Sequence, residues 1–237
     1  TAGYCDKSSG VTTDDDGHKF TDDECINGAG QSDRIIYNTD RLKLLRQGSV
    51  SLDDRSQRDG SARHMTWAVF HDLRTGREFF FSTAHLEPGA EKVSLHARQA
   101  RQILDTIQAR NPDRLPVLLV GDFSSTKFSL NGNTAHDVFV DAGYADPLGN
   151  TRKLNATAGA FAQNLVNTKY YSKNDFKAAP TVRLGSAIGD YLDYILLSSR
   201  AITAVEWETV VDLDSSGKFA GIIPSDHNLI KLTFDLP

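Results

Sequence analysis

The sequence predicts a strand-rich α+β fold, a β-sandwich with helices on its outer faces. Short apolar segments separated by turn residues recur along the chain, while only two segments change to helical spacing, and no repeat or linker divides the chain. Of its 237 residues, 39% are apolar and 24% charged. This is the composition of a globular protein that can bury a core of its own.

Residues 1–33 are polar and irregular, and we treat them as a segment separate from a domain over residues 34–237. Cys5 and Cys25 enclose most of this segment, without the ligand spacing of a zinc site. A disulfide that closes the loop is our favoured interpretation, and it implies an oxidising compartment; two free thiols are the alternative. Seven acidic and two basic residues lie between the cysteines. A solvated acidic loop explains them better than calcium, because the EF-hand spacing is absent.

The first part of the domain alternates strands and turns and ends with a helix. Strands are expected at residues 34–37, 42–45, 65–71 and 77–85, and the last two flank a short turn, which predicts a hairpin. Residues 91–110 then change to helical spacing, with Val93, Ala97, Ala100, Leu104 and Ile107 on one stripe. Asn111 and Pro112 end this helix.

The second part begins with an apolar strand at residues 116–120, of the kind that is buried on both faces. A short helix follows at residues 135–142, and residues 149–187 are rich in loops. Strands return at residues 191–197, 205–211 and 228–234. Many strands with one or two covering helices predict a single α+β domain.

Charge and hydropathy exclude two classes of protein. The longest uninterrupted apolar run is four residues, whereas a membrane-spanning helix needs about 20. The net charge of −5 argues against a protein that holds nucleic acid by bulk charge alone. An enzyme that contacts phosphate at a metal-assisted site remains compatible. Because the sequence starts at Thr1 with no initiator Met and no signal peptide, we expect a processed or truncated product. With the expected disulfide, we take the protein to be secreted or extracytoplasmic.

Polar residues stand where four apolar strands begin or end. His85 and Asp122 follow two strands, Asp193 opens a third, and Asp226 and His227 precede the last. Each of them alone is compatible with ordinary turn or capping chemistry. Because such strand ends meet at one edge of an antiparallel sheet, we expect the five side chains to converge there.

Two histidines and three aspartates with no nucleophilic cysteine fit hydrolysis of a phosphate ester. A serine hydrolase is disfavoured because no G-x-S-x-G motif occurs. Ser225 also cannot form a triad with Asp226 and His227, because neighbours along a strand point to opposite faces. Aspartates can hold Mg²⁺ or Mn²⁺ while one histidine acts on water and another stabilises the phosphoryl charge.

The segments STAHLEPG, VGDFSST, DYLDYILLSS and PSDHNLIKLTF, in this order, resemble those of the endonuclease/exonuclease/phosphatase superfamily. DRIIYNTDRLKLL also resembles the strand pair before its first histidine. The likeness runs from about Arg34 to the C-terminus. It implies a four-layer sandwich, in which two mostly antiparallel sheets are flanked by helices, and a site for Mg²⁺, or for Mn²⁺ or Ca²⁺, at one edge.

The resemblance also implies a role for each candidate residue. His227 matches the general base and Asp193 the carboxylate that orients it. His85 matches the histidine that contacts the scissile phosphate, and Asp122 the aspartate beside the nucleophilic water. Asp226, with Asp122, would bind the metal.

The chain departs from the family pattern at two places. Ser124 stands where the family usually has asparagine, two residues after the aspartate matched by Asp122; it keeps a hydroxyl but has a shorter reach. The family's N-terminal strand and its metal-binding glutamate have no counterpart, since Glu24 is the only glutamate before Tyr37. We therefore expect residues 1–237 by themselves to bind metal weakly and to have low activity.

Three functional hypotheses follow. The first is an extracellular, metal-dependent phosphodiesterase with nucleic acid as its substrate. The second is a sphingomyelinase-like phospholipase or a phosphomonoesterase, for which Phe161, Leu165, Tyr170 and Tyr171 in residues 149–187 are thin evidence of a lipid surface. The third is a catalytically silent module that keeps the fold.

Overall fold

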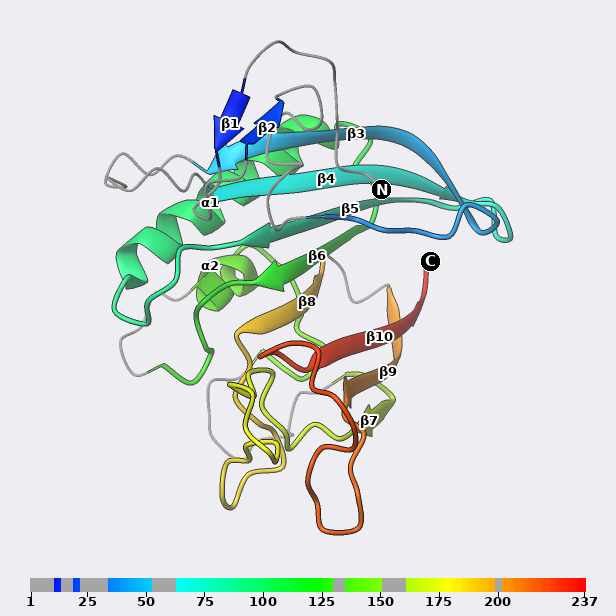
Figure 1. Ribbon diagram of the computed structural model, residues 1–237. Helices are drawn as coiled ribbons and strands as arrows, with labels where there is room; N and C mark the ends of the chain where they lie inside the picture. Colours follow the sequence, from blue (N-terminus) through cyan, green and yellow to red (C-terminus); the bar gives the residue numbers. More distant parts are fainter. Residues whose placement is uncertain are drawn as a thin grey trace.

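The computed structural model of the chain is built around two β-sheets and one long helix (Figure 1). The structure describes residues 11–13, 19–21, 34–52, 63–129, 135–150, 161–198 and 202–237. The predicted strand-rich α+β class, with two packed and mostly antiparallel sheets, is confirmed. Cys5 and Cys25 lie outside the described residues, so the disulfide remains a prediction.

The larger sheet has five strands in the order β3-β4-β5-β6-β8. Neighbouring strands are antiparallel except β5 and β6, which are parallel because helix α1 forms the connection between them. The strands are β3 (Leu42–Leu52), β4 (Arg63–Asp72), β5 (Glu78–His85), β6 (Val117–Asp122) and β8 (Asp193–Leu197).

The smaller sheet has three strands in the order β10-β9-β7, and a separate pair, β1-β2, lies near the N-terminus. Of these, β9 and β10 agree with the predicted strands, while the three-residue strands β1, β2 and β7 fall in segments predicted to be irregular. Their bounds are β1 (Val11–Thr13), β2 (Lys19–Thr21), β7 (Asn164–Val166), β9 (Thr203–Val210) and β10 (Leu229–Asp235).

The strand predicted at residues 34–37 is wrong. This stretch is irregular and pairs with no strand in the part of the chain that the structure describes, with Ile35 buried and Ile36 85% exposed. Ile35 packs into the core beside Phe70, and the Tyr37 ring lies 4.8 Å from the Phe70 ring. The segment is held by these side-chain contacts.

Side chains that alternate along the larger sheet fill two core layers. Helices α1 (Val93–Arg110) and α2 (Ala135–Asp141) cover one face of this sheet, where Phe80, Leu119 and Ile103 are buried together. The other face packs against the smaller sheet, and Phe79 lies 6.4 Å from Phe234 of β10. The prediction that the strand at 116–120 is buried on both faces is thereby confirmed. None of the helices in the described ranges is long and apolar enough to cross a membrane.

The register of the central strands brings the predicted site residues to one edge. His85 at the end of β5 pairs with Asp122 at the end of β6, and Asp122 pairs with Asp193 at the start of β8. Gly121, just before Asp122, has φ +145°, and a Cβ atom there would lie 2.0 Å from the Ala84 carbonyl oxygen. Glycine therefore allows β5 and β6 to approach at this edge.

Candidate active site

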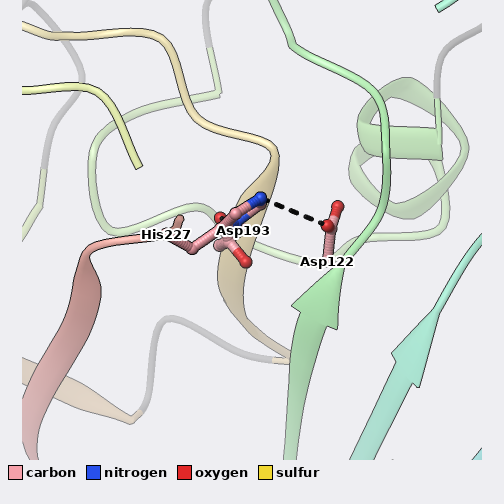
Figure 2. Close-up of side chains that lie close together, drawn as sticks. All are labelled: Asp122, Asp193 and His227. Carbon is pink, nitrogen blue, oxygen red and sulfur yellow. Dashed lines mark hydrogen bonds and ion pairs between the residues drawn. The ribbon is translucent and has the colours of Figure 1, made fainter. Parts of the chain in front are cut away.

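His227 enters this edge from the loop before β10, which belongs to the smaller sheet. Its backbone forms an isolated bridge with Lys173, in the long segment between β7 and β8. Figure 2 shows its side chain beside Asp193 of β8 and facing Asp122 at the tip of β6. We call Asp122, Asp193 and His227 the rim cluster. The two sheets thus contribute different members of one cluster.

The two nitrogens of the His227 ring have different partners. Nδ1 lies 2.7 Å from Asp193 Oδ2, a short hydrogen bond to a carboxylate. Nε2 faces Asp122 Oδ2 at 3.9 Å, which is beyond a hydrogen bond (Figure 2). The bond to Asp193 assigns the proton to Nδ1 and leaves Nε2 as the acceptor.

His85 lies on the other side of Asp122. Its Nε2 is 3.6 Å from Asp122 Oδ2, the same oxygen that His227 faces. Asp122 Oδ1 accepts a hydrogen bond of 2.7 Å from the Ser124 backbone N–H, which fixes the carboxylate between the two rings. The exposed fractions of the three side chains are 32% for His85, 19% for Asp122 and 22% for His227, so a substrate can reach them from solvent.

The electrostatics of the site follow from burial and from the two adjacent carboxylates. Burial raises the pKa of Asp122, and the negative charge of Asp193 raises it further. The hydrogen bond to Asp193 raises the pKa of the His227 ring. Burial lowers the pKa of His85. The arrangement therefore favours a neutral His85 ring. A bound cation would stabilise the charged form of the Asp122 carboxylate.

The hydroxyl of Ser124 is used inside the protein. Its Oγ donates to the Leu86 carbonyl oxygen at 3.2 Å, and the side chain is buried. The residue has φ +47°, in the left-handed region, at the turn that follows β6. Of its polar groups, the backbone N–H is the one that contacts a rim carboxylate.

The structure brings four of the six predicted site residues together, namely His85, Asp122, Asp193 and His227. Ligand atoms of the rim cluster lie within 4.8 Å of one another, and this is the one such group among the described residues. The Asp226 carboxylate is not part of it. The Asp226 backbone oxygen accepts from the N–H groups of Asn174 at 2.7 Å and Asp175 at 3.1 Å.

Sequence reasoning missed the buried polar residues that hold the His227 loop and the start of β8. Asn174 Nδ2 donates to the Ser225 carbonyl oxygen at 3.1 Å and to Asn228 Oδ1 at 3.0 Å. Ser172 Oγ accepts from the backbone N–H groups of Leu192 at 2.9 Å and Asp193 at 3.4 Å. These partners are 20 to 54 residues apart, so no local pattern predicts them.

Comparison with solved structures gives the same fold. The chain is 18% identical to a mannosyl-6-phosphatase of Bacteroides thetaiotaomicron, over 84% of this chain and 69% of that one, with a TM-score of 0.62. An endonuclease/exonuclease/phosphatase family protein of the same organism gives the same identity and TM-score, over 84% and 67% of the two chains. TDP2 of D. rerio, complexed with single strand DNA product, is 20% identical over 83% and 69%, with a TM-score of 0.53.

Sequence comparison then assigns the family. No curated protein matches the chain significantly. The model of the Endonuclease/Exonuclease/phosphatase family matches residues 31–227. This range contains His85, Asp122, Asp193 and His227, the residues that the fold gathers at one edge. The chain therefore belongs to the Endonuclease/Exonuclease/phosphatase family.

Proposed function

We propose that this protein is an extracellular, divalent-metal-dependent phosphodiester hydrolase that acts on nucleic acid. Members of its family are phosphoester hydrolases. The observation that carries the proposal is the 2.7 Å bond between His227 Nδ1 and Asp193, which leaves Nε2 directed at the Asp122 carboxylate. A base held in this way, beside a second carboxylate, suits the activation of water.

His227 would accept a proton from water at Nε2 as the water oxygen bonds to phosphorus. The ester P–O bond on the opposite side of phosphorus breaks at the same time, and the leaving oxygen departs with its electron pair and takes a proton from solvent. The Asp193 carboxylate holds the ring in the required tautomer and stabilises the imidazolium that forms. Asp122 Oδ2 faces the same nitrogen, so it can orient the water by accepting its second proton in a hydrogen bond. The proton that water loses is thus transferred directly to His227 Nε2.

His85 would bind the phosphate that is attacked. Its ring lies on the opposite side of Asp122 from His227, so a phosphate between the rings is in reach of both. A neutral imidazole can donate one N–H to a phosphate oxygen, and burial keeps the ring neutral by lowering its pKa. Charge that develops on this oxygen would be stabilised by that donor.

The residues present fit a hard divalent cation. Asp122 and Asp193 offer carboxylate oxygens within 4.8 Å of each other, and burial together with the Asp193 charge raises the pKa of Asp122. Hard oxygen ligands are those that Mg²⁺ prefers. We assign Asp122 as the residue of this chain that would bind the cation, because the Asp193 carboxylate already accepts a hydrogen bond from His227. A bound cation would neutralise charge on the phosphate.

A second candidate, a phospholipase of the sphingomyelinase kind, has one observation in its favour. Leu184 is 93% exposed, Ile222 92% and Phe176 62%. They lie on the long loops before β8 and before β10 (Figure 1), and the N–H of Asn174 bonds the Asp226 carbonyl next to His227. Exposed apolar side chains of this kind are a feature of lipid-binding surfaces.

Turnover with Mg²⁺ on DNA, RNA, sphingomyelin and bis(4-nitrophenyl) phosphate tests the proposal. We expect cleavage of nucleic acid and of the small diester, and a fall of about 10²–10⁴-fold in His227→Ala. His71→Ala is the matched control, because His71 lies at the far end of β4, where its Nδ1 is 3.6 Å from Glu78 Oε1. Unchanged turnover in His227→Ala would refute the assignment of the base.

A further inference from the structure

A cationic group lies on the far side of His85 from the rim cluster. Arg63 is the first residue of β4, and its Nε donates to Glu87 Oε2 at 3.1 Å. Glu87 follows His85 by two residues, and its side chain is only 8% exposed. The guanidinium is therefore anchored at the same edge of the sheet as the catalytic residues.

Glu87 binds a second cation besides Arg63. Lys92 Nζ contacts the second oxygen of Glu87, Oε1, at 2.8 Å. One carboxylate is thus shared by an arginine and a lysine. The Asp122 carboxylate lies beside His85 on the side of the rim cluster, and the Arg63 guanidinium lies on the other side.

The position of Arg63 in the sheet determines what it can reach. The strand order is β4-β5-β6, so Arg63 lies one strand beyond His85 and two beyond Asp122. With strands about 4.8 Å apart, its backbone is about 10 Å from that of Asp122. A phosphate bound between the His85 and His227 rings would therefore not lie next to Arg63. An anion one step further along an extended substrate would lie beside it.

The guanidinium has donors left for such an anion. Arginine carries five N–H groups, and Glu87 takes the one on Nε. Within the described part of the chain, the Nη groups contact no acceptor. The side chain is 18% exposed, so solvent and substrate can reach it. A guanidinium fork of this kind matches two oxygens of a phosphate.

We infer that Arg63, held by Glu87, binds the phosphate next to the one that is cleaved, and so selects substrates with successive phosphates. The inference rests on the proposed function, since it assumes that the phosphate that is cleaved lies between the His85 and His227 rings. A polynucleotide supplies the second phosphate. Sphingomyelin has only one, and its cationic choline would be repelled. Glu87 is a positioning residue in this scheme.

Binding without divalent metal tests the contact separately from catalysis. In EDTA, we would titrate short single-stranded DNA and RNA oligonucleotides into wild type, Arg63→Gln and Arg77→Gln over a range of salt concentrations. Arg77 is exposed in the turn at the opposite end of the same hairpin. Arg77→Gln removes one positive charge, as Arg63→Gln does, so the two variants have the same net charge. Each phosphate contact with a single strand adds about 0.7 to the slope of log K against log salt. Arg63→Gln should lower that slope by about 0.7, whereas Arg77→Gln and Arg63→Lys should keep it. An unchanged slope in Arg63→Gln would overturn the inference.

Kinetics with Mg²⁺ then separate the second phosphate from the first. Arg63→Gln should reduce kcat/KM for the oligonucleotide by about tenfold or more, mainly through KM, because a charge-assisted contact is lost. Turnover of bis(4-nitrophenyl) phosphate, which has one phosphate, should change by less than about threefold. Equal losses on both substrates would place Arg63 at the scissile phosphate and overturn the inference. If wild type cleaves neither substrate, the proposed function fails, and the salt slope still tests Arg63.

Discussion

The rim cluster and a buried cluster of Lys127, His136 and Asp146 use related residue types, and Lys127 follows Asp122 of the rim cluster by five residues. In the buried cluster, Asp146 Oδ2 accepts from Lys127 Nζ at 2.8 Å and lies 3.1 Å from His136 Nε2. All three side chains are 3% exposed or less. Burial by itself would raise the pKa of Asp146, but the Lys127 charge and His136 lower it to about 2.

Asp122 has the opposite balance. Asp193, another carboxylate, offers an oxygen within 4.8 Å of the Asp122 carboxylate, and no Lys or Arg pairs with Asp122 among the described residues. Its pKa is raised, while that of Asp146 is lowered. The buried cluster is complete within the protein and serves stability. The rim cluster lacks a cation, and a metal with its phosphate substrate would complete it.

Removing one aspartate from each cluster should give the largest contrast. Asp146→Ala leaves the Lys127 ammonium buried without its carboxylate, which should lower the free energy of unfolding by about 3–5 kcal/mol. Asp122→Ala removes repulsion with Asp193, so stability should be unchanged or higher by up to about 1 kcal/mol. Urea unfolding of both variants measures the difference. Equal losses would show that Asp122 is also a structural ion-pair partner.

The two aspartates should also respond to acid with opposite signs. The pKa of Asp146 in the fold, about 2, lies below its ordinary value of 3.8. Its contribution is therefore present at neutral pH and lost as the pH falls through both values, by roughly 2 kcal/mol between about pH 5 and pH 2. Asp122, with its raised pKa, destabilises the fold while charged, and protonation relieves this.

Unfolding measured over that pH range, in wild type and Asp146→Asn, checks the sign. The difference in stability between the two proteins should shrink by roughly 2 kcal/mol on acidification. A difference that is constant with pH would mean that Asp146 does not carry the buried charge that we assign to it.

Much of the site could be predicted because strand ends are local features. His85, Asp122 and Asp193 adjoin apolar strands in the sequence, and the register of β5, β6 and β8 places them on one edge. The irregular segment at residues 34–37 could not be predicted, since its apolar side chains pack into the core without strand pairing. The buried cluster was missed for a related reason, because Lys127 and Asp146 meet across 19 residues.

Magnesium should stabilise the protein through the rim cluster, and this effect on the free energy of unfolding should be smaller than that of removing Asp146. A ligand that binds only the folded protein stabilises it by about 1.4 kcal/mol at ten times its Kd. We expect this increase in wild type and in Asp105→Asn, which removes an exposed carboxylate from α1. Asp122→Asn should lose it, because the ligand oxygen and its charge are gone. The same increase in Asp122→Asn would place the metal outside the rim cluster.

The smallest effect is expected at Ser124, which the family resemblance placed in the site and the structure connects to Leu86. Ser124→Ala removes the Oγ hydrogen bond to the Leu86 carbonyl and keeps the backbone N–H that orients Asp122. Stability should fall by about 1 kcal/mol, the usual cost of one neutral hydrogen bond. Turnover should fall less than about tenfold, because the carboxylate stays in place. Urea unfolding and turnover of the small diester, measured on the same preparation, separate the two effects. A loss of about 10²-fold in turnover with unchanged stability would instead show that the hydroxyl leaves Leu86 and contacts the phosphate during the reaction.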